Sequence, residues 1–226
     1  MPNDISIRTL LPMACDGVGP SMTCLNIHQG MHAAGYDTEL FAIRRRIRMP
    51  DIRAVFALPR VLSHLPYSTV RSRAAARIER LFLEAIVPEN IAFLWPTASL
   101  DMHRALHELG IPIVLEGINT RMLTAKQILD TAYADMGLPP SHGITEERIA
   151  EEEAKYDLAT AIFAPNAEVE HALAGTPLET GILPTSYGVH LRHASPPRTY
   201  REGEDMVFMF CGYASVRKGI HFILDA

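Results

Sequence analysis

The sequence has few cysteines, and none of them stands in a spaced pair. Cys15, Cys24 and Cys211 are the only three among 226 residues, and no two fall at a Cys-x-x-Cys spacing. This argues against a disulfide framework or a zinc ribbon and favours a reducing compartment. The chain also lacks an apolar run of the roughly 20 residues that cross a bilayer. Its start, Met-Pro-Asn-Asp, lacks the basic segment of a signal peptide. These absences predict a soluble, cytoplasmic protein.

Several signatures of function are missing as well. The net charge of −5 gives no reason to expect nucleic acid as a partner. Neither a Walker loop nor a Gly-x-Ser-x-Gly elbow occurs. Two histidine pairs stand four residues apart, His28 with His32 and His103 with His107, but both lack the glutamate of a His-Glu-x-x-His site. We therefore interpret them as surface histidines and expect neither a metal nor a cofactor.

Charge is distributed unevenly along the chain. Residues 43–80 hold ten arginines against two acids, whereas residues 130–180 hold eleven acids against one arginine and one lysine. One interpretation is two solvated helical faces. The other is orientation on an anionic membrane, with residues 43–80 in peripheral contact at its inner face. Both interpretations stay open at this point.

Short apolar runs alternate with amphipathic stretches, a pattern typical of a parallel α/β sheet with helices on both faces. We expect strands at 5–11, 37–43, 91–95, 111–116, 161–164 and 181–183. We expect helices at 21–34, 68–87, 123–136 and 145–156, one from Ser99 to Gly110, and one capped by Asn166.

The composition changes near residue 190. Residues 190–205 are polar and include Pro196 and Pro197, which indicates a linker. An apolar strand, Met206–Cys211, and a helix that runs to Ala226 follow. One strand and one helix cannot close a core of their own. We therefore expect a first domain at 1–189, a linker at 190–205, and the start of a truncated second domain at 206–226.

In an open parallel sheet, ligands bind beyond the carboxyl ends of the strands. This rule selects the loops 13–20 and 116–121, the turn after Trp95, and residues 184–189. Gly17 and Gly19 would let a ligand approach the backbone, where free helix amides favour an anion or a sugar hydroxyl. The alternative is a plain tight turn between strand and helix.

A dinucleotide fingerprint is only half present. Gly17-x-Gly19 begins one, but Met22 stands at the third glycine position, and no acid ends the second strand. The arginines 44–46 follow that strand and would suit a 2′-phosphate, so an NADP-dependent oxidoreductase stays open as an alternative.

Arg217-Lys218-Gly219 lies between the last apolar strand and the last helix. The cations and the first helical amides would converge on one anion there. A diphosphate suits this arrangement, since arginine offers a planar fork and lysine a point charge. A solvated basic turn is the alternative.

Four segments, taken in order, resemble the retaining GT-B glycosyltransferases of family 4. The first is the glycine-bearing strand–loop–helix up to Gly35 with the strand YDTELF, and the second is EERIAEEEAKYDLATAIFAPNAEVEHAL. The third, ILPTSYGV, resembles the family's crossing into its second domain, and the fourth, FMFCGYASVRKGIHFILDA, resembles the opening of its donor domain. The sequence departs from the family pattern at Tyr213, His190 and Asn166, which replace an Arg, an Asp and a Ser.

The resemblance implies two Rossmann-like domains and a sugar transfer, with retention, from a nucleotide-diphosphate sugar to a sugar, lipid or other small acceptor. It assigns the donor diphosphate to Lys218 and Arg217, and the cleft to Gly17, Gly19 and Gly188. It implies no metal. Arg121 stands where many relatives place a catalytic His. We expect Glu116, Asn119 and Arg121 on the acceptor side, with Glu116 and Arg121 catalytic. The 226 residues alone are expected to be inactive, and a truncated, non-catalytic module is a further alternative.

Overall fold

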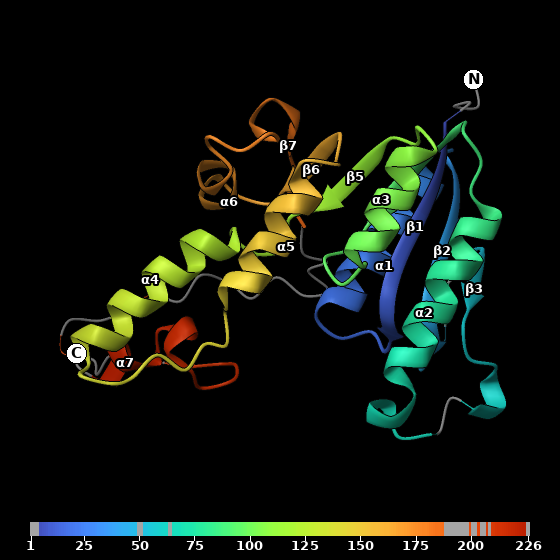
Figure 1. The fold of residues 1–226 in the computed structure, drawn as a ribbon. Coiled ribbons are helices and arrows are strands. Elements are labelled where there is room, and N and C mark those ends of the chain that lie inside the picture. Colours follow the sequence, from blue (N-terminus) through green and yellow to red (C-terminus); the bar gives the residue numbers. More distant parts are fainter. Residues whose placement is uncertain are drawn as a thin grey trace. The chain divides into compact units, whose positions relative to one another are not determined.

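Seven parallel strands form one sheet in the order β3-β2-β1-β4-β5-β6-β7 (Figure 1). The computed structural model describes residues 5–48, 52–62, 65–187, 199, 203, 207 and 209–224. The strands are β1 Ser6–Cys15, β2 Asp37–Arg45, β3 Ala54–Phe56, β4 Asn90–Leu94, β5 Ile113–Glu116, β6 Ala161–Ala164 and β7 Ile182–Pro184. The predicted α/β, Rossmann-like sheet is confirmed.

Helices connect most of the strands. They are α1 Pro20–Ala33, α2 Tyr67–Ala85, α3 Leu100–Glu108, α4 Met122–Asp135, α5 Glu146–Tyr156, α6 Ala167–Ala172 and α7 Ile220–Leu224. Three short 3₁₀ turns are η1 Arg60–Leu62, η2 Glu179–Gly181 and η3 Val216–Lys218. None of the described helices is long and apolar enough to cross a membrane.

The sheet buries side chains on both faces because successive residues of a strand point to opposite sides. On one face Leu10 and Phe41 pack in a cluster with residues of α2, α3 and α6. On the other face Leu11 and Leu40 pack with Cys24 and neighbouring residues of α1. Helices on both faces, as the sequence predicts, are thus confirmed.

Two predicted helix caps are confirmed. The Ser99 hydroxyl accepts a hydrogen bond from the amide of Met102 at 3.1 Å, and the Asn166 side chain accepts one from the amide of Val169 at 3.1 Å. Each bond satisfies one of the amides that a helix start leaves without a partner. Ser99 also donates its hydroxyl to Glu79 of α2 at 2.8 Å, which ties α2 to the start of α3.

Three differences from the sequence predictions concern strands. β1 runs to Cys15, beyond the predicted end at residue 11, because β2 beside it is long enough to pair with it. β3, a three-residue edge strand, was not predicted, since so short a run between arginines gives no clear period. The predicted strand 206–211 is wrong for its described residues, Val207 and Met209–Cys211, which belong to no strand. A strand needs a hydrogen-bonded neighbour, and none of the described strands pairs with them.

The chain divides into two compact units. The first unit comprises residues 1–121 and 150–187 and holds the whole sheet, and the second comprises residues 122–149 and 188–226. Residues 122–149 are grouped with residues 188–226 in this division, and the predicted first domain at 1–189 stays a prediction. The predicted boundary at 189 and the linker 190–205 lie almost wholly outside the described residues and stay predictions.

Candidate active site

The carboxyl edge of the sheet, where the parallel strands end, gathers the loops that follow β1, β4, β5 and β7. β1 and β4 are neighbours, and from them the chain continues outward in opposite directions, to β2 and β3 on one side and to β5, β6 and β7 on the other. Ligands of open α/β sheets bind in the crevice at such a reversal of strand order. The residues at these strand ends are therefore the candidates for an active site.

The glycine loop after β1 is closed by its own side chains. The Ser21 hydroxyl donates to the Asp16 carboxylate at 2.6 Å and accepts the amide of Gly17 at 3.0 Å, while the amide of Val18 donates to Asp16 at 3.1 Å. Gly17 and Gly19 both adopt positive φ angles, 76° and 52°. The glycines therefore shape a turn at the end of β1, and the amides of Gly17 and Val18 are already bonded to side chains of this turn. The cleft position of Gly17 and Gly19, and the free amides expected at the start of the following helix, stay predictions.

This loop offers a carboxylate in place of an anion site. Asp16 is exposed, whereas Ser21 is buried beneath the loop. An exposed carboxylate repels a diphosphate but accepts hydrogen bonds from sugar hydroxyls. Neither residue was predicted from the sequence, although a serine four residues after Gly17, at the helix start, is a signal for such a turn. The closed loop also argues against a dinucleotide at this position.

Glu116, the last residue of β5, is the most unusual ionisable group at the carboxyl edge. Its side chain is almost fully buried, with 3% of the residue exposed, and burial raises the pKa of its carboxyl group to about 7. The Tyr187 hydroxyl donates a hydrogen bond to Oε1 at 2.5 Å, which opposes part of this rise. The second oxygen, Oε2, is buried and has no partner among the described residues.

Two further buried polar atoms lie at strand ends on this edge. Trp95 follows β4 and Thr185 follows β7, and the indole Nε1 and the Thr185 hydroxyl both lack a partner within the described residues. Buried polar atoms are rarely left unpaired in native proteins. The donor at Trp95, just after β4, and the acceptor at Glu116, the last residue of the adjacent strand β5, thus mark this edge as a place where a polar ligand would satisfy groups that the described residues leave unpaired.

Arg121 is bound to the acid-rich helix. Its guanidinium group forms two hydrogen bonds with the Glu153 carboxylate of α5, at 2.6 and 2.7 Å, and this contact raises the pKa of Arg121. Side-chain exposure is 18% for Arg121 and 31% for Glu153. This pair therefore joins the loop after β5 to α5. Asn119 lies exposed in the loop between β5 and Arg121.

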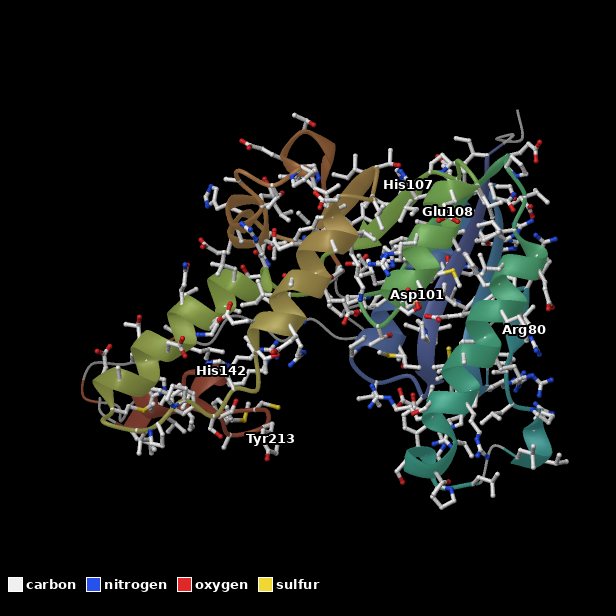
Figure 2. All side chains as sticks on the ribbon, in the orientation of Figure 1. Arg80, Asp101, His107, Glu108, His142 and Tyr213 are labelled. Atoms are coloured by element: carbon white, nitrogen blue, oxygen red, sulfur yellow. The ribbon has the colours of Figure 1, made fainter. Side chains whose placement is uncertain are left out.

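The basic turn of the second unit is exposed. Lys218 and Arg217 lie in η3, and the next helix, α7, has only five residues. Tyr213, which replaces the arginine of the family pattern, is 86% exposed (Figure 2). Gly188, predicted at the cleft, lies outside the described residues. The diphosphate role of Lys218 and Arg217 stays a prediction.

Two of the four paired histidines are buried rather than at the surface. His28 and His103 are buried at 1% and 2% exposure, and burial lowers the pKa of each to about 4. His103 Nδ1 donates to the Ser99 carbonyl at 2.7 Å, and His28 contacts Thr9 at 3.3 Å. These neutral rings are part of the core, which corrects the surface interpretation. Within the described residues no group of acids, histidines and cysteines is arranged to hold a metal.

Neither a protein-family model nor a curated protein sequence matches this chain. One solved structure with a similar fold is the crystal structure of TcCGT1 in complex with UDP, at 14% identity and a TM-score of 0.49, over 88% of this chain and 54% of that one. Another is a UDP-glucosyltransferase from Polygonum tinctorium capable of glucosylating indoxyl, at 14% identity and a TM-score of 0.46, over 85% and 54%. The chain thus spans about half the length of these structures. Likenesses of this strength do not assign a function.

Proposed function

We propose that this chain is the acceptor-side part of a GT-B glycosyltransferase of the family 4 type, which moves a sugar from a nucleotide diphosphate to an acceptor hydroxyl. The observation that carries the proposal is Glu116, a buried carboxyl group at the end of β5 with one oxygen held by Tyr187 and the other without a partner among the described residues. The family resemblance of the sequence supplies the reaction class. Cytoplasmic location is part of the same proposal.

Glu116 would bind and activate the acceptor. The hydroxyl of Tyr187 already donates to Oε1, so an acceptor hydroxyl that took the place of the phenol would make the same hydrogen bond. When the acceptor oxygen bonds to the anomeric carbon of the donor sugar, its proton must leave. A carboxylate with a pKa of about 7 is well matched to take up that proton near neutral pH. The exposed carboxylate of Asp16 would accept hydrogen bonds from other hydroxyls of the acceptor.

The donor diphosphate would lie at Lys218 and Arg217. Negative charge grows on the diphosphate as the glycosidic bond breaks, and cations stabilise that charge without a metal. Arg121, with Asn119 beside it, would line the acceptor side, and Glu153 would fix the orientation of the Arg121 guanidinium group. We propose retention of the anomeric configuration, as the family resemblance implies, and peripheral contact of residues 43–80 with an anionic membrane.

The test is sugar transfer by the intact protein that contains this chain, with a panel of nucleotide sugars and acceptors. We expect transfer with retained configuration, read by NMR of the product, and no transfer by the 226 residues alone. Glu116→Gln should lower kcat/KM about 100-fold. Glu108→Gln, an exposed change of the same kind on α3, is the matched control. If Glu116→Gln turns over like the wild type, or if no nucleotide sugar is consumed, the proposal fails.

A further inference from the structure

The connection between β3 and α2 carries apolar side chains in solvent. Val61 and Leu62 of η1 are 81% and 41% exposed, and Leu65, just before α2, is 42% exposed. Large aliphatic residues that lie together on one short connection indicate a surface that a binding partner covers. The connection follows β3 and therefore lies at the carboxyl edge of the sheet, the edge that also holds Glu116.

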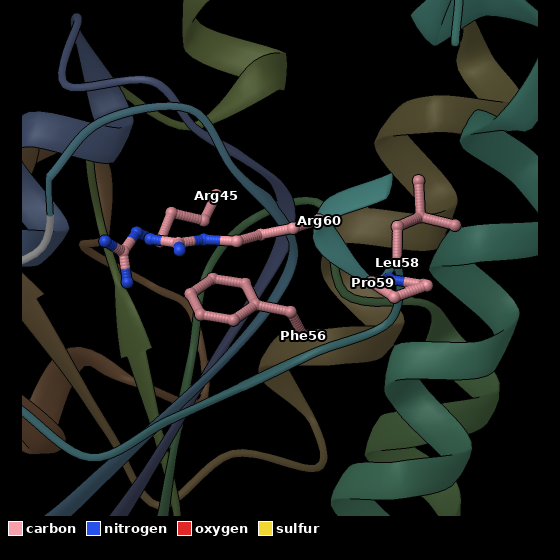
Figure 3. Close-up of a pocket in the computed structure, with 5 residues that line it drawn as sticks. All are labelled: Arg45, Phe56, Leu58, Pro59 and Arg60. Atoms are coloured by element: carbon pink, nitrogen blue, oxygen red, sulfur yellow. The ribbon is translucent and has the colours of Figure 1, made fainter. Parts of the chain in front are cut away.

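A cationic pocket lies directly beside these apolar residues. It has a volume of about 300 Å³ and is lined by Arg45, Phe56, Leu58, Pro59 and Arg60 (Figure 3). In this view the Arg45 and Arg60 side chains extend in the same direction, and the Arg60 side chain passes the ring of Phe56. The Arg45 side chain is held in place by a hydrogen bond from Nε to the carbonyl of Ile47 at 2.9 Å.

Two guanidinium groups in one pocket favour an anion with several oxygens. The five lining residues are two arginines and three apolar residues. Arginine binds phosphate through a planar fork of donors, and two neighbouring forks offer more donors to one phosphate group than a single arginine does. Arg46 and Arg48, which follow β2, and Arg71, on the first turns of α2, are exposed and add to the positive charge of residues 43–80.

We propose that this tip, residues 60–62 and Leu65 with the Arg45–Arg60 pocket, docks on an anionic phospholipid bilayer. The pocket takes the phosphate of one lipid headgroup, and Val61, Leu62 and Leu65 enter the boundary between headgroups and acyl chains. A soluble phosphate compound would need the two arginines but would leave the three apolar residues in water. The combination of cations with adjacent aliphatic side chains is that of an interfacial membrane contact.

This inference rests on the membrane contact proposed above and refines it. The contact with the bilayer is assigned to one pocket and three apolar residues, in place of a general attraction of ten arginines to anionic lipid. The docked tip would bring the carboxyl edge of the first unit toward the bilayer surface, where an acceptor attached to a lipid is found. The inference itself does not require that the reaction be a sugar transfer.

The experiment is vesicle flotation of the 226-residue protein. Vesicles of phosphatidylcholine alone are compared with vesicles that also contain phosphatidylglycerol, at low and high salt. We expect binding to the anionic vesicles only. Arg45→Gln with Arg60→Gln should weaken it about 30-fold, since each cation near an anionic surface contributes about fivefold. Val61→Ser with Leu62→Ser should weaken it at least tenfold, with much less dependence on salt. Arg73→Gln with Arg77→Gln, exposed changes further along α2, is the control of equal charge.

Each outcome decides the proposal. A loss confined to the pocket and apolar variants, with thermal melts that match the wild type, supports it. If the Arg73/Arg77 variant loses as much affinity as the pocket variant, only diffuse charge acts, and the pocket assignment fails while the membrane contact stands. No binding of the wild type to anionic vesicles overturns both, without touching sugar transfer, which is assayed separately. If NADP binds to the wild type in titration and not to the pocket variant, the phosphate is a soluble one, and the lipid assignment is wrong.

Discussion

The two regions that carry the proposed chemistry are built in different ways. Glu116 lies at the end of a buried strand, is 3% exposed, and is held by Tyr187. Lys218 lies exposed in a short 3₁₀ turn of the second unit, before a helix of five residues. One group is fixed by packing and hydrogen bonds, whereas the other is presented to solvent.

This difference has a consequence for mutagenesis. A buried ionisable group affects folding as well as chemistry, because its charged form costs free energy in the folded state. An exposed lysine costs the fold almost nothing and affects only what it binds. Substitutions at the carboxyl edge should therefore change stability, and those at the basic turn should change activity alone.

The largest effect on stability is expected from Glu116→Gln. The pKa of Glu116 is raised to about 7 in the folded state, from an ordinary value of 4.5. A carboxyl group whose pKa is raised in the folded state makes its full contribution to the free energy of unfolding below pH 4.5. That contribution is lost as the pH rises through 7. The loss is about 3 kcal/mol. Since glutamine does not ionise, Glu116→Gln should be more stable than the wild type at pH 8 by up to about 3 kcal/mol, and similar to it at pH 4.5.

Urea unfolding of both proteins from pH 4.5 to pH 8 measures this difference. Glu108→Gln on α3, an exposed change of the same chemistry, serves as control and should follow the wild type at every pH. A constant difference between Glu116→Gln and the wild type over this range would mean that Glu116 is ionised normally, and the contrast between the two regions would disappear.

Lys218→Ala should affect only the proposed reaction. In the intact enzyme we expect kcat/KM to fall about 100-fold, because a cation next to the leaving diphosphate stabilises the charge that grows there. Lys218→Arg should restore only part of the rate, since a planar fork does not fill the place of a compact ammonium group. Thermal melts of all three proteins should coincide. A lowered melting temperature in Lys218→Ala would show a structural role, and unchanged kinetics would remove the diphosphate role.

The same contrast explains what the sequence could and could not predict. The strand and helix pattern follows from the period of apolar residues, and the caps at Ser99 and Asn166 follow from local chemistry. Glu116 was selected because it ends a buried strand. Its hydrogen bond to Tyr187 joins residues 71 positions apart, and the pairing of Arg121 with Glu153 spans 32. Such pairings depend on strand order, which no local pattern contains. β3 was missed because it is only an edge strand of three residues.

A smaller effect is expected where Arg121 meets α5. Glu153→Gln removes one charge from a pair with two short hydrogen bonds and partial burial. Breaking a fully buried pair costs 3–5 kcal/mol, so about 2 kcal/mol is expected for this less buried one. Glu168→Gln, exposed in α6, is the control for charge. The free energy of urea unfolding at neutral pH gives the measurement. A loss no larger than that of the control would mean that solvent screens the pair and that Arg121 is held by other contacts.

The smallest effect concerns the glycine loop, which lies at the same edge as Glu116 but is closed by its own groups. Ser21→Ala removes the hydroxyl that donates to Asp16 and accepts the amide of Gly17. Asp16 still accepts the amide of Val18, so only part of the network is lost. We expect a destabilisation of about 1 kcal/mol, the usual contribution of one such hydrogen bond. Thr23→Ala, a hydroxyl deletion in the same helix, is the control and should cost less, because the Thr23 hydroxyl makes only a long hydrogen bond, to the Gly19 carbonyl at 3.4 Å. The released amide of Gly17 would then be open to an anion. If Ser21→Ala binds inorganic phosphate in a titration and the wild type does not, the closed loop is what keeps phosphate away from this part of the carboxyl edge. Equal phosphate binding by both proteins would show that the Ser21 and Asp16 side chains do not occupy the loop in solution.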